Sequence, residues 1–142
     1  MEWLKMTIDY RDPEWSDLAT ELCGHRVDVW WVDSDQIPGA HGLAEYRKIY
    51  INRDSPRTKH SYILLHEIAH VMLGHAPDHT DRRYKTALHL HKQEYGDDIR
   101  WRTYTPAEKP RENAADKLTI QLCVKHQPSQ LDNVRYYINE RN

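Results

Sequence analysis

The segment from about residue 58 to residue 73 constrains the fold most, because apolar residues cover most of its circumference when it forms a helix. These residues are Ile63, Leu64, Leu65, Ile68, Ala69, Val71, Met72 and Leu73. A helix that is apolar nearly all round is a buried helix, so other elements must pack on several of its sides. The chain has 142 residues, the usual size of one domain, and we expect a single domain over 1–142 around this helix.

Two histidines and a glutamate interrupt this apolar surface in the order His66-Glu67-Ile68-Ala69-His70. Residues four apart share one helix face, so the two imidazoles can converge on one metal ion. Glu67 is displaced around the helix, where it can reach a water molecule held by that ion. The spacing predicts His66 and His70 as metal ligands and Glu67 as a catalytic base. The alternative is a pair of core histidines with hydrogen-bond partners inside the protein.

A second predicted helix, from Pro110 to about Lys125, offers a third ligand. It carries Glu112 and Asp116 on one face. Glu112 could complete a three-ligand zinc site, and Asp116 could accept the free ring N–H of a ligand histidine. Alternatively, Glu112 only stabilises the helix start and Asp116 is a solvated charge. His75 is a weaker candidate ligand, because it would point away from the histidine pair if the first helix continued.

The remaining patterns predict an α+β fold. Asp12 and Pro13 favour a helix start, and Gly24 favours its end. Further elements are expected as strands over 26–33, 42–46 and 48–52, with the last two forming a hairpin, and as helices over 81–95 and from Ser129 onward. We therefore expect a small, mainly antiparallel sheet packed against the 58–73 helix, with the other helices around it.

Two segments of this chain resemble the ImmA/IrrE family of small metallopeptidases. They are HEIAHVMLGH (66–75) and ENAADKLTIQL (112–122), and the strand ending at residue 52 adds to the likeness, which covers about 37–125. The chain departs from the family pattern at Ala114, at Leu118 and over 123–125, and it keeps Glu112 and Asp116.

The resemblance implies a minimal zincin-like domain, of the gluzincin type. It implies zinc bound by His66, His70 and Glu112, with Glu67 as the general base. It also implies a protein substrate in the cytoplasm of a bacterium or phage-derived element. A DNA-binding, repressor-type transcription regulator is the substrate that the family suggests, although no helix-turn-helix is recognisable in this chain.

The sequence does not determine two further features of such a peptidase, the group that stabilises the oxyanion and the place where the substrate binds. Hydrolysis needs a group that stabilises the oxyanion, and the candidates are His75, His79, His89, His91 and Tyr104. An exposed edge at the predicted strand over 42–46 could hold an extended peptide by strand addition.

Composition argues against other classes of partner. The formal charge of −2 gives no general attraction to nucleic acid or anionic lipid, and the basic residues between 47 and 59 are typical of a solvated face. No apolar run approaches the ~20 residues of a membrane helix, and no secretory signal is recognisable. Cys23 and Cys123 fit a reducing compartment. We expect a cytoplasmic chain without a nucleic-acid or membrane partner. The sequence does not determine its oligomeric state.

The alternative function is a non-catalytic, zinc-stabilised protein-interaction module, such as a toxin/antitoxin-like or regulatory partner.

Overall fold

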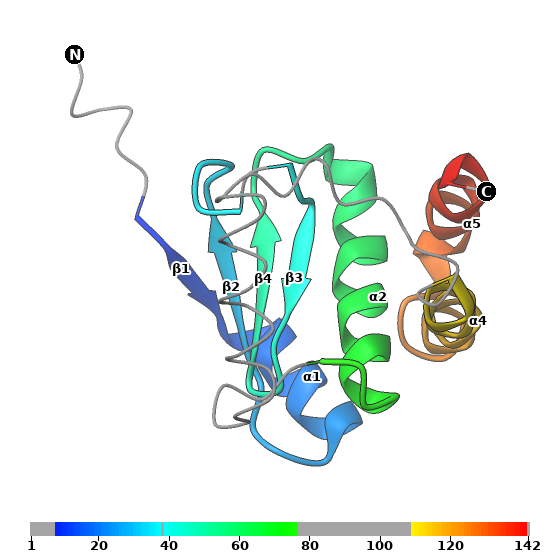
Figure 1. The fold of residues 1–142 in the computed structure, drawn as a ribbon, viewed down its shortest axis with the longest axis horizontal. Coiled ribbons are helices and arrows are strands. Elements are labelled where there is room, and N and C mark those ends of the chain that lie inside the picture. The colour runs from blue at the N-terminus through cyan, green and yellow to red at the C-terminus, as the bar shows by residue number, and fades with distance from the viewer. Residues whose placement is uncertain (1–7, 38, 77–108, 142) are drawn as a thin grey trace.

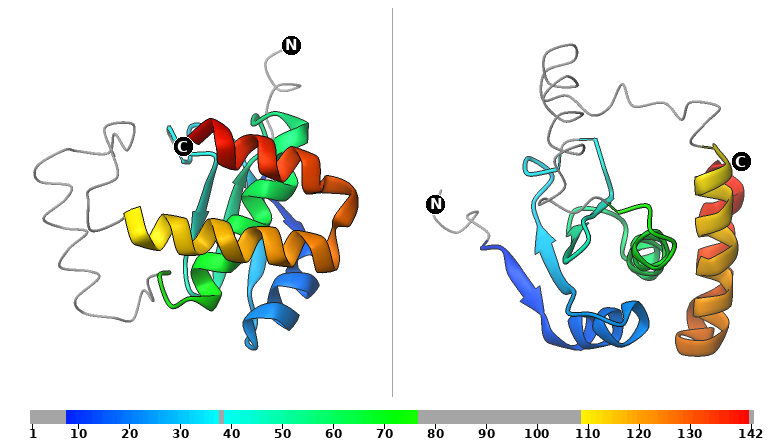
Figure 2. Two further views of the ribbon diagram at one scale, coloured as in Figure 1. Left: turned by 90° about the vertical axis from the view of Figure 1, so that its right-hand side faces the viewer. Right: turned by 60° about the horizontal axis from the view of Figure 1, so that its bottom comes forward.

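The computed structural model describes residues 8–37, 39–76 and 109–141, which form an α+β fold (Figure 1). Its elements in chain order are β1 (Tyr10–Asp12), α1 (Pro13–Cys23), β2 (Asp28–Val32), β3 (Gly42–Ala44), β4 (Lys48–Asn52), the 3-10 helix η2 (Arg57–Lys59), α2 (His60–Met72), α4 (Lys109–His126), the 3-10 helix η3 (Pro128–Gln130) and α5 (Leu131–Arg141). Helix α2 lies between the sheet and the α4–α5 pair (Figure 2). The predicted helix over 81–95 falls outside the described residues.

The four strands form one mixed sheet in the order β1-β2-β4-β3. The β1–β2 and β3–β4 pairs are antiparallel, as the expectation of a mainly antiparallel sheet requires. The central β2–β4 pair is parallel, with Val29 opposite Ile49 and Trp31 opposite Ile51, and this pairing was not predicted. The order leaves β3 at one edge of the sheet, next to α2.

Helix α1 begins and ends where its sequence signals predict. The Asp12 carboxylate accepts a hydrogen bond from the Trp15 backbone N–H at 2.9 Å, and Pro13 occupies the first helical position. Gly24 ends the helix with φ 79°, a conformation that glycine adopts without a steric penalty. The helix packs on β2 and on α2.

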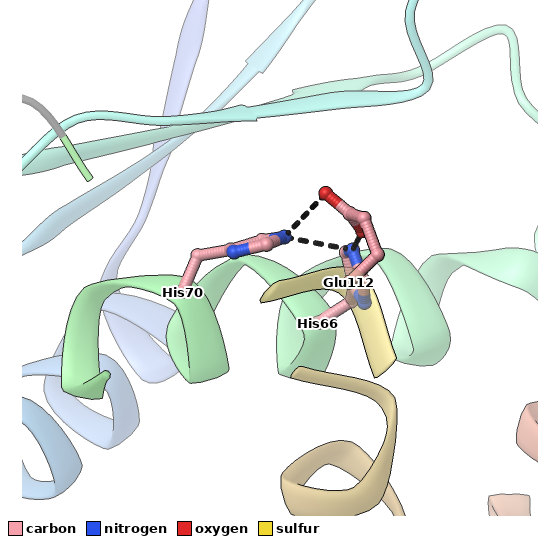
Figure 3. A group of neighbouring side chains, drawn as sticks. All are labelled: His66, His70 and Glu112. Atoms are coloured by element: carbon pink, nitrogen blue, oxygen red, sulfur yellow. Dashed lines mark hydrogen bonds and ion pairs between the residues drawn. The ribbon is translucent and has the colours of Figure 1, made fainter. Parts of the chain in front are cut away.

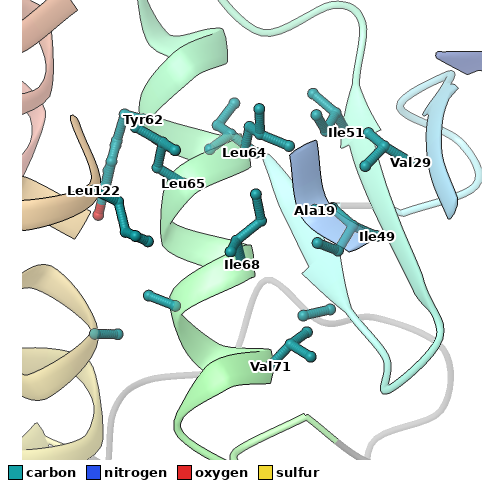
Figure 4. Close-up of a cluster of buried hydrophobic side chains, with 14 of the residues drawn as sticks. Ala19, Val29, Ile49, Ile51, Tyr62, Leu64, Leu65, Ile68, Val71 and Leu122 are labelled. Carbon is teal, nitrogen blue, oxygen red and sulfur yellow. The ribbon is translucent and has the colours of Figure 1, made fainter. Parts of the chain in front are cut away.

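The core forms around α2, as the apolar pattern predicts. Leu64, Leu65 and Ile68 have no exposed surface. The sheet contributes side chains such as Ile49 and Ile51 on one side of α2 (Figure 4). The α4–α5 pair contributes Ala115, Leu122, Cys123, Val134 and Ile138 to the same cluster. Because close-packed elements enclose α2 on both sides, side chains on this helix are held in fixed positions.

Small differences from the expected elements lie at their ends. The 3-10 turn η2 precedes α2, and the 3-10 turn η3 precedes α5, so Ser129 lies within a 3-10 turn and does not open the last helix as a cap. The three-residue strand β1 was not predicted. Within the described part of the chain, no helix has the length and apolar character needed to cross a membrane.

Candidate metal centre

The side chains of His66, His70 and Glu112 converge between α2 and α4 (Figure 3). Nε2 of His66 lies 3.0 Å from Nε2 of His70 and 3.0 Å from Oε2 of Glu112. Nε2 of His70 lies 3.2 Å from Oε1 of Glu112. Among the described residues, these three form the group of histidine, cysteine and carboxylate side chains that is close enough to share one metal ion.

The positions of the three donors follow from the two helices that carry them. His66 and His70 are one turn apart on the same face of α2. Glu112 lies in the first turn of α4, which packs across α2. Ala115 is fully buried in the same apolar cluster as the core residues of α2. The side chains of His66, His70 and Glu112 are 9, 14 and 17% exposed, so the cluster is sheltered but keeps some access to solvent.

Asp116 lies one turn after Glu112 and contacts the other side of the His66 ring. Its Oδ1 is 3.2 Å from Nδ1 of His66 and accepts a hydrogen bond from the Tyr62 hydroxyl at 3.3 Å. Asp116 is 5% exposed. The structure therefore brings Asp116 to the position that its spacing suggested, beside the ring nitrogen of His66 that faces away from Glu112.

The protonation of this cluster is strongly perturbed. Burial lowers the pKa of His66, but hydrogen bonds to Asp116 and Glu112 outweigh this and raise it to about 9. Burial raises the pKa of Glu112, but hydrogen bonds from His66 and His70 hold it far below its usual range. Without a metal ion, a proton on His66 and the charge of Glu112 stabilise each other. A divalent cation between the same atoms would take the place of that proton.

Glu67 points to a different neighbour, the edge strand β3. A Cβ atom built on Gly42 would lie 3.2 Å from Cγ and 3.3 Å from Oε1 of Glu67. Glu67 is half-buried and is not a member of the converging group of donors. This agrees with the expectation that Glu67 is displaced around the helix from the two histidines.

His75 lies close to the cluster but is not one of its three converging donors. Because α2 ends at Met72, the chain turns back and places Nδ1 of His75 3.1 Å from Nδ1 of His70. The expectation that His75 points away assumed a longer helix. Gly74, a common residue at helix ends, was the signal in the sequence that could have corrected it. The other candidates for oxyanion stabilisation, His79, His89, His91 and Tyr104, lie outside the described residues.

Comparisons of this chain with protein-family models, with curated proteins and with solved structures find no match.

Proposed function

We propose that this chain is a zinc-dependent endopeptidase that hydrolyses peptide bonds of a protein substrate. The observation that carries the proposal is the convergence of His66, His70 and Glu112, with contacts of 3.0–3.2 Å between their nitrogen and oxygen atoms. Glu67 follows His66 directly in α2. Two imidazoles and one carboxylate are a donor set found in catalytic zinc sites, in which a fourth position stays open.

The spacing of the donors suits zinc. Donor atoms about 2.0–2.1 Å from zinc at tetrahedral angles lie about 3.3 Å from one another. The two Nε2 atoms are 3.0 Å apart, and they lie 3.0 and 3.2 Å from the two oxygens Oε2 and Oε1 of Glu112, which is close to this value. His66, His70 and Glu112 would hold the ion with small side-chain adjustments, and Asp116 would keep the His66 ring oriented through its Nδ1–H.

Zinc held by His66, His70 and Glu112 would supply Lewis acidity, which would lower the pKa of bound water and polarise a peptide carbonyl. Glu67 then acts as the general base: its carboxylate removes a proton from the attacking water. The same carboxyl group later donates that proton to the leaving amine, so Glu67 returns to its ionised form at the end of the cycle.

The edge strand β3 offers a place for the substrate. Among the described strands it pairs with β4 alone, and Gly42 places its backbone directly beside Glu67. An extended peptide added to this edge would run past the proposed base, and strand addition is a common mode of peptide recognition. Substitution of Leu43, Glu45 and Tyr46 by alanine, or of residues 43–46 by proline, should therefore reduce peptide cleavage.

The substrate class comes from the resemblance of residues 66–75 and 112–122 to the ImmA/IrrE family. On this basis the substrate is a DNA-binding repressor that the chain cleaves in the cytoplasm. The chain would then meet DNA only through its substrate.

The test is to measure bound zinc and cleavage of a library of quenched fluorescent peptides, in the wild type and in Glu67→Gln. We expect Glu67→Gln to keep its zinc and to lose cleavage. Glu140→Gln, which neutralises an exposed carboxylate on α5, serves as the control and should keep both properties. A wild type that binds zinc but cleaves no peptide or repressor would instead favour the non-catalytic interaction module. A wild type without zinc would overturn the site itself.

A further inference from the structure

We propose that His75 is a positioning residue for His70: it accepts the Nδ1–H of His70 and so holds Nε2 of that ring toward the metal ion. This inference rests on the proposed metal site and adds to it a residue outside the helix that carries the ligands.

The contact between the two rings supports this role. Their Nδ1 atoms are 3.1 Å apart, a hydrogen-bond distance, and Nε2 of His70 points the other way, to His66 and Glu112. A neutral imidazole that binds a metal through Nε2 carries its proton on Nδ1. Nδ1 of His75 must then be the acceptor, and the proton of the His75 ring is on Nε2. Metal-binding histidines nearly always donate their second ring N–H to an acceptor, commonly a carboxylate, a backbone carbonyl or water. In this site a second imidazole would take that place.

The end of α2 holds His75 in place. The backbone N–H of Gly74 donates to the carbonyl of Val71 at 3.1 Å, and that of His75 donates to the carbonyl of His70 at 2.8 Å. This pair of hydrogen bonds is the Schellman motif, which needs a left-handed residue after the helix. Gly74 has φ 75°, a value that other residues adopt only with strain. His75 is therefore tied to His70 twice, once through the backbone and once through the ring.

The arrangement gives each ligand histidine its own partner at Nδ1. His66 faces the carboxylate of Asp116 at 3.2 Å, whereas His70 faces a second imidazole. The two partners reach the site from different elements, Asp116 from α4 and His75 from the turn after α2. Loss of either partner should loosen one ligand ring without removing a donor from the site.

The first test compares the zinc affinity of the wild type, His75→Ala and His75→Asn by competition with a chelator. Removal of a partner to a metal-binding histidine typically costs about 10–100-fold in affinity, and we expect this loss in His75→Ala. The amide oxygen of Asn can stand where Nδ1 of His75 stands, so His75→Asn should restore most of the affinity. Equal affinity in the wild type and in His75→Ala, or no restoration by Asn, would overturn the inference. A wild type that binds no zinc would instead refute the proposed function.

The second test uses a matched pair of glycines. Gly24 and Gly74 both follow a helix with positive φ, 79° and 75°, and a Cβ built on either meets no atom within 4 Å. Alanine at either position should therefore strain the backbone to a similar degree and lower the melting temperature of the metal-free protein similarly. Only Gly74→Ala should also weaken zinc binding, because only this turn carries His75. Equal zinc affinity in the two variants would contradict the inference.

Discussion

Gly42 at the edge of the sheet lies directly against Glu67 on α2, with no room for a side chain between them. A Cβ atom on Gly42 would lie 2.5 Å from Cγ2 of Ile63 and 3.2 Å from Cγ of Glu67. The first distance is too short for a real contact, so a substitution at Gly42 must move the Ile63 side chain, α2 or β3. The glycine therefore permits the close approach that brings the edge strand to the proposed base.

Gly42→Ala is expected to keep its zinc and to lose peptidase activity, because the added methyl group displaces the Glu67 carboxylate. It should also lose about 1–3 kcal/mol of unfolding free energy, the usual cost of overpacking. The measurements are zinc content, kcat/KM on a cleaved peptide, and urea unfolding.

A double-mutant cycle with Ile63→Ala checks the cause of the stability loss. In the Ile63→Ala background the atom nearest to the new methyl group is absent, so Gly42→Ala should cost less than in the wild type. An equal cost in both backgrounds would show that the contact with Ile63 is not the reason.

Asp116 is expected to strengthen zinc binding through its contact with Nδ1 of His66. Asp116→Ala removes the acceptor and should weaken zinc binding by about 10–100-fold. Asp116→Asn keeps an oxygen that can accept the same hydrogen bond, so its loss should be smaller. Titration against a chelator measures both, and Asp132→Asn on the exposed side of α5 is the control. A zinc affinity of Asp116→Ala equal to that of the wild type would argue against this role.

Much of the site could be predicted because its signals are local. The spacing of His66 and His70 within one helix fixes their shared face, and Glu112 and Asp116 repeat the same spacing in α4. The cap of α1 at Asp12 is local in the same sense, since residues within one turn form it. In each case the residues that define the pattern lie within four positions of one another.

Other features depend on partners far apart in the chain. The parallel pairing of Val29 with Ile49 joins strands separated by β3, and no short pattern encodes such a register. Strand β1 has only three residues, too few for a recognisable alternation. The contact of His75 with His70 required knowing that α2 ends at Met72 and that Gly74 reverses the chain. Sequence patterns indicate such a turn, but they do not show where the next side chain points.

Glu112 is the ligand whose removal tests the site most directly. Because it is the carboxylate of the converging group, Glu112→Ala leaves two imidazoles, which cannot form a three-ligand site. We expect about one zinc ion per chain after dialysis of the wild type and little in Glu112→Ala. Glu140→Ala provides the matched control on the exposed surface of α5. Unchanged zinc in Glu112→Ala would mean that another residue completes the site.

The metal-free protein should lose stability as the pH rises above neutrality. In the folded chain the contacts of His66 with Asp116 and Glu112 raise its pKa from 6.5 to about 9, despite burial. A raised pKa means that the folded state binds the proton more tightly than the unfolded state. The resulting contribution to the free energy of unfolding is therefore complete below pH 6.5 and disappears as the pH passes 9. The pKa of Glu112 is lowered, so its contribution is present above pH 4.5 and disappears only in stronger acid.

Urea unfolding in the presence of a chelator should therefore show a decline in free energy between pH 6.5 and pH 9. His66→Gln removes the titrating ring, so the decline due to this group should be absent in that variant. With saturating zinc, the ion replaces the proton on His66, and zinc should stabilise the fold more as the pH rises through this range. The same decline in the wild type and in His66→Gln would place the responsible group elsewhere in the chain.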